Sequence, residues 1–312
     1  MPVFTVRGPE RLDAFLAAQQ SIISRAVAQR LIRTACVTVN GVVVTKRALM
    51  LKPGDIVCVT QTEEAPLRED IVPTDLKLPV LYEDAACLVL DKPAGLAVHP
   101  APSIPPTERT LLHGIAFLFS QRSIPFAPDA VLVHRLDRET TGCILVAKTK
   151  EAHHALQKQF EERSVKKTYV ALVAGVPNPP SALIDAPVGR NLLERVKMSI
   201  LRTSTSREAR TAYRTLSSSR DCALLACDLF TGRTHQIRVH LSAIGHPILG
   251  DPTYASVGSE RLSTDLHVVS LCLHARELTF TSPVGDVRHT IIAPLPEALT
   301  KAMRTAGVQM SV

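Results

Sequence analysis

The first sixty residues change from a helical to a strand spacing of their apolar positions. Apolar residues at helical spacing predict a short amphipathic helix built on Leu12, Phe15 and Leu16. A second helix is predicted after Ser24, a residue suited to cap it, with an inner face formed by Val27, Leu31 and Ile32. The chain is therefore expected to begin with a pair of short helices.

Strand signals follow these helices. Two runs of β-branched residues, 37–39 and 42–44, flank Asn40-Gly41. This dipeptide is a strong hairpin signal because both residues tolerate positive φ angles. A turn at residues 52–55 precedes a last strand over residues 56–60. Residues 1–62 are therefore expected to form a small α+β domain.

Charge indicates a partner for this domain. Residues 1–60 hold eight Lys or Arg and three acidic residues, a balance of +5 within the chain's formal net charge of +7. For a single arginine a solvated helix face is the better interpretation, but the cluster as a whole favours the phosphate backbone of RNA. The candidate RNA-binding residues of this domain are Arg25, Arg30, Arg33, Lys46 and Arg47.

The composition then changes twice. Residues 61–76 carry five acidic residues against one arginine, together with Pro66 and Pro73, which is typical of an extended linker. From residue 78 the chain has the apolar content of a globular domain, and 46% of all residues are hydrophobic. We therefore divide the chain into a first domain over residues 1–62, an acidic linker over 63–77 and a large domain over 78–312.

Other features of composition limit the class of protein. The seven cysteines are odd in number, form no C-x-x-C pair and lie mostly in apolar runs, so we expect reduced, buried thiols and no zinc site. The first residues lack a signal-peptide pattern, and no apolar run reaches the length of a membrane span. We therefore expect a cytoplasmic protein that acts away from membranes.

The most informative stretch is residues 131–148. A short polar loop lies between two apolar runs that predict strands, and it holds Asp137 between Arg135 and Arg138. Loops supported by strands often carry catalytic groups. A single Asp in such a turn is, however, more often a turn-former or part of a surface ion pair. Residue chemistry by itself therefore makes Asp137 a candidate and no more.

A family resemblance strengthens the case for Asp137 as a catalytic residue. The stretch His134-Arg135-Leu136-Asp137-x-x-Thr140-x-Gly142 resembles the signature of the RluA-type pseudouridine synthases, with Thr141 where that family usually has Ser and Cys143 where it has Leu. Four further stretches resemble the same family in the expected order, as does Leu273-His274-Ala275-Arg276 near the end. These four are residues 91–100, 166–175, 231–241 and 245–252.

The first domain has a resemblance of its own. Short matches at residues 11–13, 24–25, 37–41 and 52–55 resemble the S4-like RNA-binding domain. Together the two resemblances imply an α+β fold. A pseudouridine synthase catalytic domain with a mixed, mostly antiparallel sheet would follow a small α+β S4-like domain.

The resemblance implies a role for four residues. Asp137 would be the catalytic carboxylate, which either attacks carbon 1 of the ribose or removes a ribose proton; both openings suit a carboxylate that is ionised near neutral pH. Arg238 would pair with Asp137 from a helix that carries apolar residues at helical spacing. Tyr169 would stack on the target base, with help in moving the proton at carbon 5 as a second role. Arg135 would contact RNA beside the extruded nucleotide.

These observations predict an RNA pseudouridine synthase that isomerises specific uridines, with large-subunit ribosomal RNA as the favoured substrate. Transfer RNA, a non-catalytic ribosome-assembly factor and a nucleoside hydrolase are the alternatives. The isomerisation is redox-neutral, so we expect no cofactor and no metal. His153 and His154 are expected on the exposed side of a helix over residues 150–162. The expected partner is structured RNA, and we favour a monomer.

Overall fold

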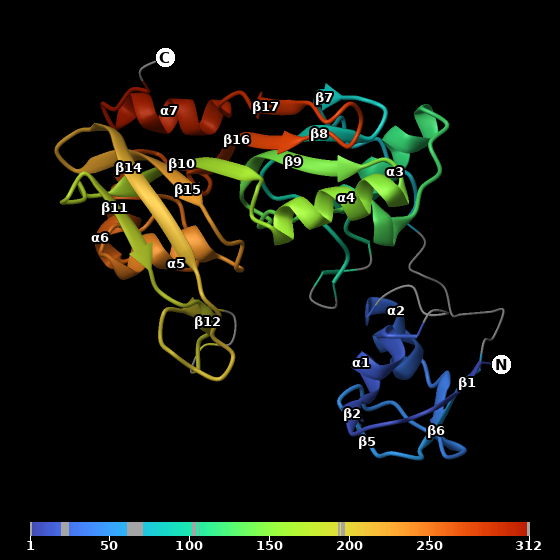
Figure 1. Ribbon diagram of the computed structural model, residues 1–312. Helices are drawn as coiled ribbons and strands as arrows, with labels where there is room; N and C mark the ends of the chain where they lie inside the picture. Colours follow the sequence, from blue (N-terminus) through green and yellow to red (C-terminus); the bar gives the residue numbers. More distant parts are fainter. Residues whose placement is uncertain are drawn as a thin grey trace. The chain divides into compact units, whose positions relative to one another are not determined.

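The computed structural model describes residues 2–19, 25–60, 71–101, 104–105, 107–192, 194 and 197–310; the side chains of residues 25–27 and 30 are outside this description. The chain divides into two compact units, Met1–Asp70 and Ile71–Val312 (Figure 1). Ser24 and residues 63–70 of the predicted linker lie outside the described residues. Ile71 and Leu76 pack against the core of the larger unit.

The smaller unit contains a four-stranded antiparallel sheet in the order β1-β6-β3-β4, a two-stranded β2-β5 pair and two helices. Asn40 and Gly41 have φ angles of 52° and 81° and form the predicted hairpin turn between β3 and β4. The elements are β1 (Val3–Thr5), β2 (Glu10–Arg11), α1 (Leu12–Ala17), α2 (Arg25–Arg33), β3 (Val37–Val39), β4 (Val42–Val43), β5 (Met50–Leu51) and β6 (Ile56–Val59). Both predicted helices, the hairpin and the last strand are confirmed.

In the described part of the larger unit, nine strands form one sheet in the order β11-β14-β15-β10-β16-β9-β8-β7, with β17 also paired to β16. Neighbouring strands are antiparallel except β9 and β16, which are parallel. This confirms the mixed, mostly antiparallel sheet. The strands are β7 (Val80–Glu83), β8 (Cys87–Lys92), β9 (Thr141–Ala147), β10 (Lys166–Ala174), β11 (Ser181–Asp185), β14 (Arg210–Ser218), β15 (Cys222–Leu229), β16 (Leu273–Thr281) and β17 (Arg288–Ile292).

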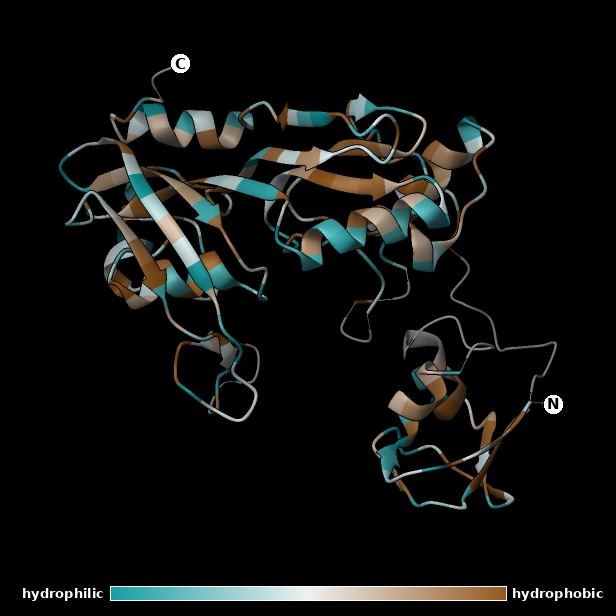
Figure 2. Ribbon diagram, in the orientation of Figure 1, coloured by the Kyte–Doolittle hydropathy of each residue, from teal (hydrophilic) through white to brown (hydrophobic). Residues whose placement is uncertain are grey.

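Helices cover both faces of this sheet. All seven residues of β9 are buried, and residues 143–147 alternate between two apolar cores. Cys143 and Leu145 meet α4 (Lys150–Glu161) on one face. Ile144 and Val146 meet α3 (Leu111–Gln121) on the other face. Figure 2 shows the correspondingly apolar character of the central strands. Because β9 is buried on both faces, its sequence is an uninterrupted run of mostly apolar residues.

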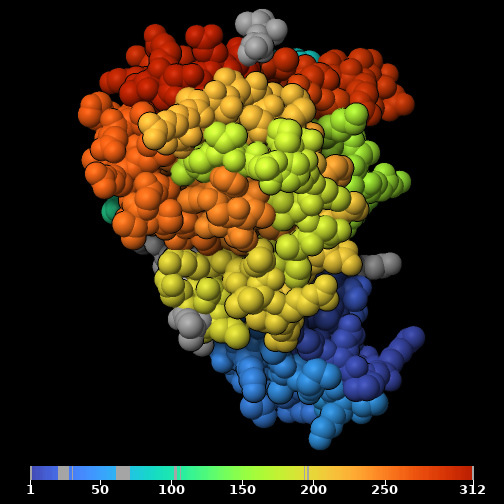
Figure 3. Space-filling view, turned by 90° about the vertical axis from the view of Figure 1, so that its left-hand side faces the viewer, coloured from blue at the N-terminus to red at the C-terminus, as the bar shows by residue number. Residues whose placement is uncertain are grey.

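Three helices and a short strand pair complete the described elements. The helices are α5 (Gln236–Ala243), α6 (Val257–Asp265) and α7 (Glu297–Thr305), and the short β12 (Gly189–Arg190) pairs with β13 (Met198–Ser199). α5 and α6 lie near the β11 end of the sheet, and α7 runs alongside the sheet (Figure 1). Figure 3 views this end of the larger unit, where α6 (orange) lies at the surface below α7 (red). Six of the seven cysteines are buried, and Cys58 is half-buried.

One predicted strand is wrong. Residues 131–133 follow a short 3-10 helix, Pro128–Ala130, and make an isolated bridge from Leu132 to Val146 where a regular strand was expected. The chain leaves the edge of β9 at once for the polar loop, so pairing stops after this bridge. His153 is also less exposed than predicted, because its Nε2 lies 3.1 Å from the carbonyl oxygen of Leu132, whereas His154 is exposed.

Candidate active site

The polar loop before β9 is anchored at its start by His134. The backbone N–H of Leu145 donates to His134 Nε2 at 2.8 Å, and the imidazole stacks on the ring of Phe160 with centroids 4.8 Å apart. Desolvation, with a smaller contribution from Lys167, lowers the pKa of His134 to about 3. A neutral imidazole is therefore available as an acceptor, and His134 fixes the loop to β9.

A buried lysine anchors the middle of the loop. Lys92 is fully buried at the end of β8. Its ammonium donates to the carbonyl oxygens of Pro93, Leu96 and Arg138 at 2.7, 2.8 and 2.8 Å. Burial lowers the pKa of Lys92 to about 8, and the negative charges of Glu139 and Asp137 oppose this change. Lys92 thus ties residues 91–100 to the loop one residue after Asp137.

The loop ends at a glycine that no other residue can replace without strain. Gly142 has a φ of +106°, and a Cβ there would lie 2.3 Å from the carbonyl oxygen of Ala275. The preceding Thr141 places its hydroxyl 2.8 Å from His274 Nδ1. These contacts join the loop to β16. The hydroxyl of Thr141 therefore has a buried partner on β16.

Asp137 faces Arg238 across the cleft. Asp137 Oδ2 lies 3.4 Å from Arg238 Nη1, and its side chain is 18% exposed. The guanidinium is bound more closely by Asp251, through Nε at 2.8 Å and Nη2 at 2.7 Å, and Nη2 also donates to the Thr253 hydroxyl at 2.9 Å. Burial disfavours the charge, but the hydrogen bonds that Arg238 donates to Asp251, together with the negative charge of Asp251, outweigh burial and raise the pKa of Arg238. The expected pair exists, but Asp251 is the principal partner of Arg238.

Tyr254 supports the same guanidinium from another side. Its ring centroid lies 5.1 Å from Arg238 Cζ. Its hydroxyl accepts from the backbone N–H of Met198 at 2.8 Å and lies 2.9 Å from His235 Nδ1. His235 begins α5 with a left-handed φ of 55°. Burial lowers the pKa of His235 although Asp137 opposes the change, so this imidazole is mostly neutral at pH 7.

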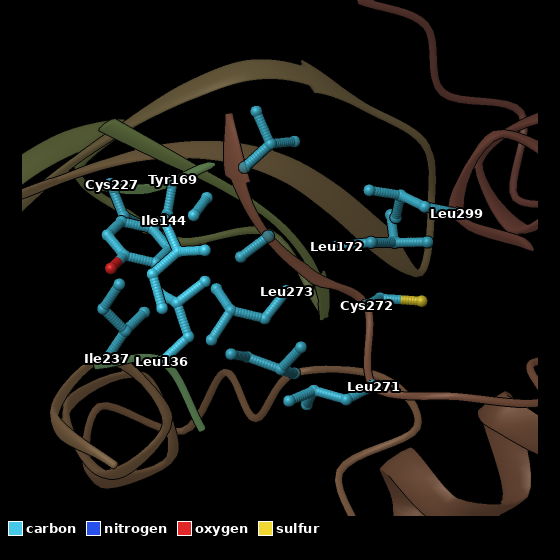
Figure 4. Packing of buried hydrophobic residues seen from close by; sticks show 14 of the residues in the cluster. Leu136, Ile144, Tyr169, Leu172, Cys227, Ile237, Leu271, Cys272, Leu273 and Leu299 are labelled. Carbon is cyan, nitrogen blue, oxygen red and sulfur yellow. The ribbon is translucent and has the colours of Figure 1, made fainter. Parts of the chain in front are cut away.

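Tyr169 forms the apolar wall of the site. It is 7% exposed and lies in β10, where β16 places two residues opposite it in a bulge. Figure 4 shows its ring beside Leu136 and Ile237, with the hydroxyl oxygen at the edge of the apolar group. Burial, reinforced by the charge of Asp137, raises the pKa of Tyr169. The phenol therefore stays protonated near neutral pH.

These side chains surround a cavity of about 70 Å³. Asp137, Tyr169, His235 and Arg238 line it together with Arg135. A second cavity of about 370 Å³ adjoins it, and Arg135 and Tyr169 line both. The site therefore holds a carboxylate, a restrained guanidinium and an aromatic ring around a space that opens into a larger cleft.

The two arginines that flank Asp137 in sequence have different surroundings. Arg135 is exposed and lines both cavities. Arg138 donates from Nε to the carbonyl oxygen of Gly95 at 3.0 Å and pairs with Glu108 at 3.1 Å. Arg135 is therefore available to a ligand, whereas Arg138 helps to hold the loop.

Comparison with known proteins agrees with this arrangement. The sequence profile of RNA pseudouridylate synthase matches residues 86–243, which include Asp137, Tyr169 and Arg238. The chain belongs to the RNA pseudouridylate synthase family. The profile of the S4 domain matches residues 10–57 of this pseudouridine synthase.

Several relatives match over nearly the whole chain. A protein of Pseudomonas aeruginosa named ribosomal large subunit pseudouridine synthase D is 38% identical over 297 residues, covering 93% of this chain and 90% of the relative. A protein of the same name from Nitrosomonas europaea is 38% identical over 302 residues, covering 94% and 84%. Among solved structures, human RNA pseudouridylate synthase domain containing 4 has a TM-score of 0.59 and 29% identity, covering 74% of this chain and 94% of the human one.

The structure of this pseudouridine synthase brings together four residues selected from sequence: Asp137, Tyr169, Arg238 and Arg135. In the smaller unit Arg33, Lys46 and Arg47 are exposed, as RNA contacts require. Arg25 and Arg30 lie in α2, but their side chains are outside the described residues. The roles assigned to all nine stay predictions.

Sequence reasoning missed the residues that hold these groups in place. They are Lys92, His235, Asp251, Thr253 and Tyr254. Asp251 had a detectable signal, because it directly follows the apolar run Pro247-Ile248-Leu249-Gly250. A carboxylate that is buried in such a position needs a cationic partner. Lys92 gave a weaker signal, since a lysine at the end of an apolar strand is usually exposed.

Neither a metal site nor a membrane-spanning helix is present among the described residues. No group of three or more His, Cys, Asp or Glu side chains there is arranged to hold a metal ion. Within the same ranges, no helix combines the length and the apolar character needed to cross a membrane. His240, which sequence places five residues after His235, is instead buried between the Thr211 hydroxyl and the carbonyl oxygen of Ala186, each at 2.9 Å.

Proposed function

We propose that this chain converts specific uridines of large-subunit ribosomal RNA to pseudouridine, with Asp137 as the catalytic carboxylate. The observation that carries the proposal is the partly exposed carboxylate of Asp137 in a cavity it shares with Tyr169 and Arg238. The ribosomal substrate is supported by relatives of about 38% identity that are named for the large subunit.

The reaction would begin with extrusion of the target uridine from the RNA, which costs a few kcal/mol. Asp137 then either attacks carbon 1 of the ribose or removes a ribose proton, and the bond to nitrogen 1 breaks. The uracil turns and rejoins the ribose through carbon 5. In the first route this attack displaces Asp137 from carbon 1, and in the second Asp137 returns the ribose proton. The hydrogen of carbon 5 leaves as a proton, nitrogen 1 gains a proton, and the product is an isomer of the substrate.

Arg238 would act on Asp137 as a fixed hydrogen-bond donor. Asp251 and Thr253 occupy Nε and Nη2, so Nη1 is the part of the guanidinium directed at Asp137. Because this donor is already in position before the reaction, the guanidinium does not have to reorganise when the carboxylate reacts. Because Asp251 already balances the positive charge, Asp137 can be oriented by Arg238 and still react.

Tyr169 would pack its ring against the uracil during the rotation. Its raised pKa leaves the phenol protonated, which favours this packing role over removal of the proton from carbon 5. Arg135, exposed at the rim of both cavities, would contact the phosphate beside the extruded nucleotide. In the first domain Arg33, Lys46 and Arg47, with Arg25 and Arg30, would bind the backbone of the surrounding RNA.

The proposal extends to where and how the protein acts. Ribosomal RNA as substrate implies a cytoplasmic site of action. A monomer is proposed because each unit has its own apolar core and one chain supplies every residue named in the catalytic site.

The test uses unmodified transcripts labelled with tritium at carbon 5 of uracil. Release of tritium to water from the large-subunit transcript, without free uracil, is the expected result. Release from transfer RNA alone would replace the proposed substrate, and free uracil would indicate a hydrolase. Asp137→Asn should abolish release while RNA affinity is retained; an active variant would disprove the role of Asp137. Glu162→Gln, on the exposed end of α4, is the matched control and should react normally.

A further inference from the structure

The second cavity contains neither Asp137 nor Arg238. Its walls come from the polar loop before β9, the C-terminal end of α4 with the turn that follows, the start of β10, and residues 229–233 after β15. It holds about 370 Å³ and opens to solvent beside the first cavity. Its position next to the catalytic site, with shared walls, makes it accessible to whatever is covalently attached to a uridine in that site.

Charge in this cavity is strongly one-sided. Four cations line it against a single acid, Glu161; the cations are Arg135, Arg163, Lys167 and Arg233. Within the described ranges none of the four makes an ion pair with an acidic side chain. His134 also lines the cavity but stays neutral. An anion bound here would relieve the mutual repulsion of these groups.

Two of these cations show the effect of their neighbours directly. Burial and the charge of Arg163 lower the pKa of Lys167 to about 8. Burial, then Arg207 and Arg163, lower the pKa of Arg233. Both shifts mean that burial and the neighbouring cations disfavour the positive charges of Lys167 and Arg233. A cavity with four cations and one acid on its walls is suited to a polyanionic ligand.

The cavity also offers an exposed aromatic ring. Phe230 lies on its wall and is 47% exposed, which is unusual for a side chain of this size and polarity. Phe160, on another wall, is already occupied by the His134 ring and by Lys167 Nζ, 5.5 Å from its centroid. Arg210 Cζ also lies over the Phe230 ring, 5.7 Å from its centroid, so a ligand would stack on the part of this ring that remains exposed. Bases of any sequence stack on such rings.

We propose that this cavity is a subsite for the nucleotide that adjoins the target uridine, with its phosphate between Arg163, Lys167 and Arg233 and its base on Phe230. The inference rests on the proposed function, since it assumes an RNA strand with its uridine at Asp137. It assigns Lys167 and Phe230 to substrate binding and to no step of the chemistry. Stacking and phosphate contact make the subsite tolerant of sequence at the neighbouring position.

The first experiment compares Lys167→Met with Lys158→Met in the full chain. Met preserves the length of the half-buried Lys167 side chain, and Lys158 is an exposed lysine of α4 that lies outside the cavity. Affinity for the large-subunit transcript and kcat/KM for tritium release are measured from 50 to 300 mM KCl. Loss of one phosphate contact should reduce the slope of log affinity against log salt by about 1 and raise KM about tenfold at 150 mM.

The expected pattern is an altered KM and salt slope with kcat unchanged for Lys167→Met, and no change for Lys158→Met. Phe230→Ala should also raise KM, by about tenfold at any salt concentration, and Phe230→Tyr should restore it. An unchanged salt slope in Lys167→Met, or a loss confined to kcat, would overturn the phosphate assignment. If the wild type releases no tritium from any RNA, the proposed function fails, and the affinity measurements still decide whether the cavity binds RNA.

A second experiment locates the phosphate. Short RNAs carry an uncharged methylphosphonate on the 5′ side or the 3′ side of the modified uridine. One of the two should raise the KM of the wild type about tenfold and leave the KM of Lys167→Met unaffected. Equal, additive effects in both proteins at both positions would show that Lys167 does not contact a phosphate next to the target.

Discussion

The substitution Asp251→Asn tests whether Arg238 can act on Asp137 only while Asp251 fixes the position of its guanidinium. The side chains of Arg238 and Asp251 are 5% and 0% exposed, and two short hydrogen bonds join them. In Asp251→Asn the counter-charge is lost, and one guanidinium N–H faces the amide nitrogen of Asn, which cannot accept. Asp137 then remains as the nearest carboxylate to Arg238, so the guanidinium should shift toward it.

The magnitude follows from these contacts. Breaking a buried ion pair costs about 3–5 kcal/mol. The Thr253 hydroxyl and the Tyr254 ring still hold the guanidinium, so the lower end, about 3 kcal/mol of the free energy of unfolding, is expected. For a unit of this size that corresponds to a fall in Tm of about 6–12 °C. A displacement of about 1 Å at the reacting groups should lower kcat about 100-fold.

The assay combines thermal unfolding with tritium release on the large-subunit transcript. KM should stay within a fewfold of the wild-type value, because RNA contacts lie elsewhere. Asp185→Asn is the control, since Asp185 is 65% exposed and pairs with Arg210 at 3.5 Å on the surface, where such pairs contribute about 0–1 kcal/mol. A wild-type kcat in Asp251→Asn would refute the reasoning that Asp251 positions Arg238.

Three further predictions concern other parts of the molecule. Lys92→Met leaves three carbonyl oxygens without donors, and each unsatisfied carbonyl costs roughly 1–3 kcal/mol of the free energy of unfolding. Part of this loss is offset because the variant no longer buries an ammonium group. We expect Tm and kcat to fall together, and an unchanged Tm would contradict the anchoring role. Because the pKa of Lys167 is lowered to about 8, its charge is lost as pH rises from 7 to 9. KM for RNA should therefore rise over that interval, and Lys167→Arg should make KM less dependent on pH. Between pH 8 and 10.5 the unfolded chain binds one more proton at this lysine than the folded chain, so the contribution of Lys167 to the free energy of unfolding increases as pH rises through that window. Replacing Arg33, Lys46 and Arg47 by Gln together should reduce the salt slope of RNA affinity by about 2 and leave kcat unchanged, and full affinity at 200 mM KCl would argue against docking by the first domain.

The elements with local signals were predictable from the sequence. The hairpin at Asn40-Gly41 depends on the φ preferences of two adjacent residues, and the helix with Leu12, Phe15 and Leu16 depends on one apolar face. The loop with Asp137 was found because its motif is contiguous. The strand expected at residues 131–133 failed because apolar composition does not reveal whether a sheet edge is free to pair.

The supporting contacts were not predictable, because each joins residues far apart in sequence. Lys92 reaches the carbonyl group of Arg138, 46 residues away, and Thr141 meets His274 across 133 residues. The ion pair between Arg238 and Asp251 spans 13 residues, yet its geometry depends on how α5 meets the following loop. Such pairings are set by tertiary packing, which a single sequence does not display.

The parallel pairing of β9 with β16 has a mechanical consequence. It consists of two residue pairs in register, His274 with Thr141 and Ala275 with Gly142, and it joins the β7-β8-β9 half of the sheet to the half that contains β10, β14 and β15 (Figure 1). Asp137 belongs to the first half, and Tyr169 and Arg238 to the second. A shear along this short seam would change the gap between carboxylate and guanidinium while the ladders within each half stay intact. The action proposed for Arg238 on Asp137 would therefore depend on the alignment of the two half-sheets.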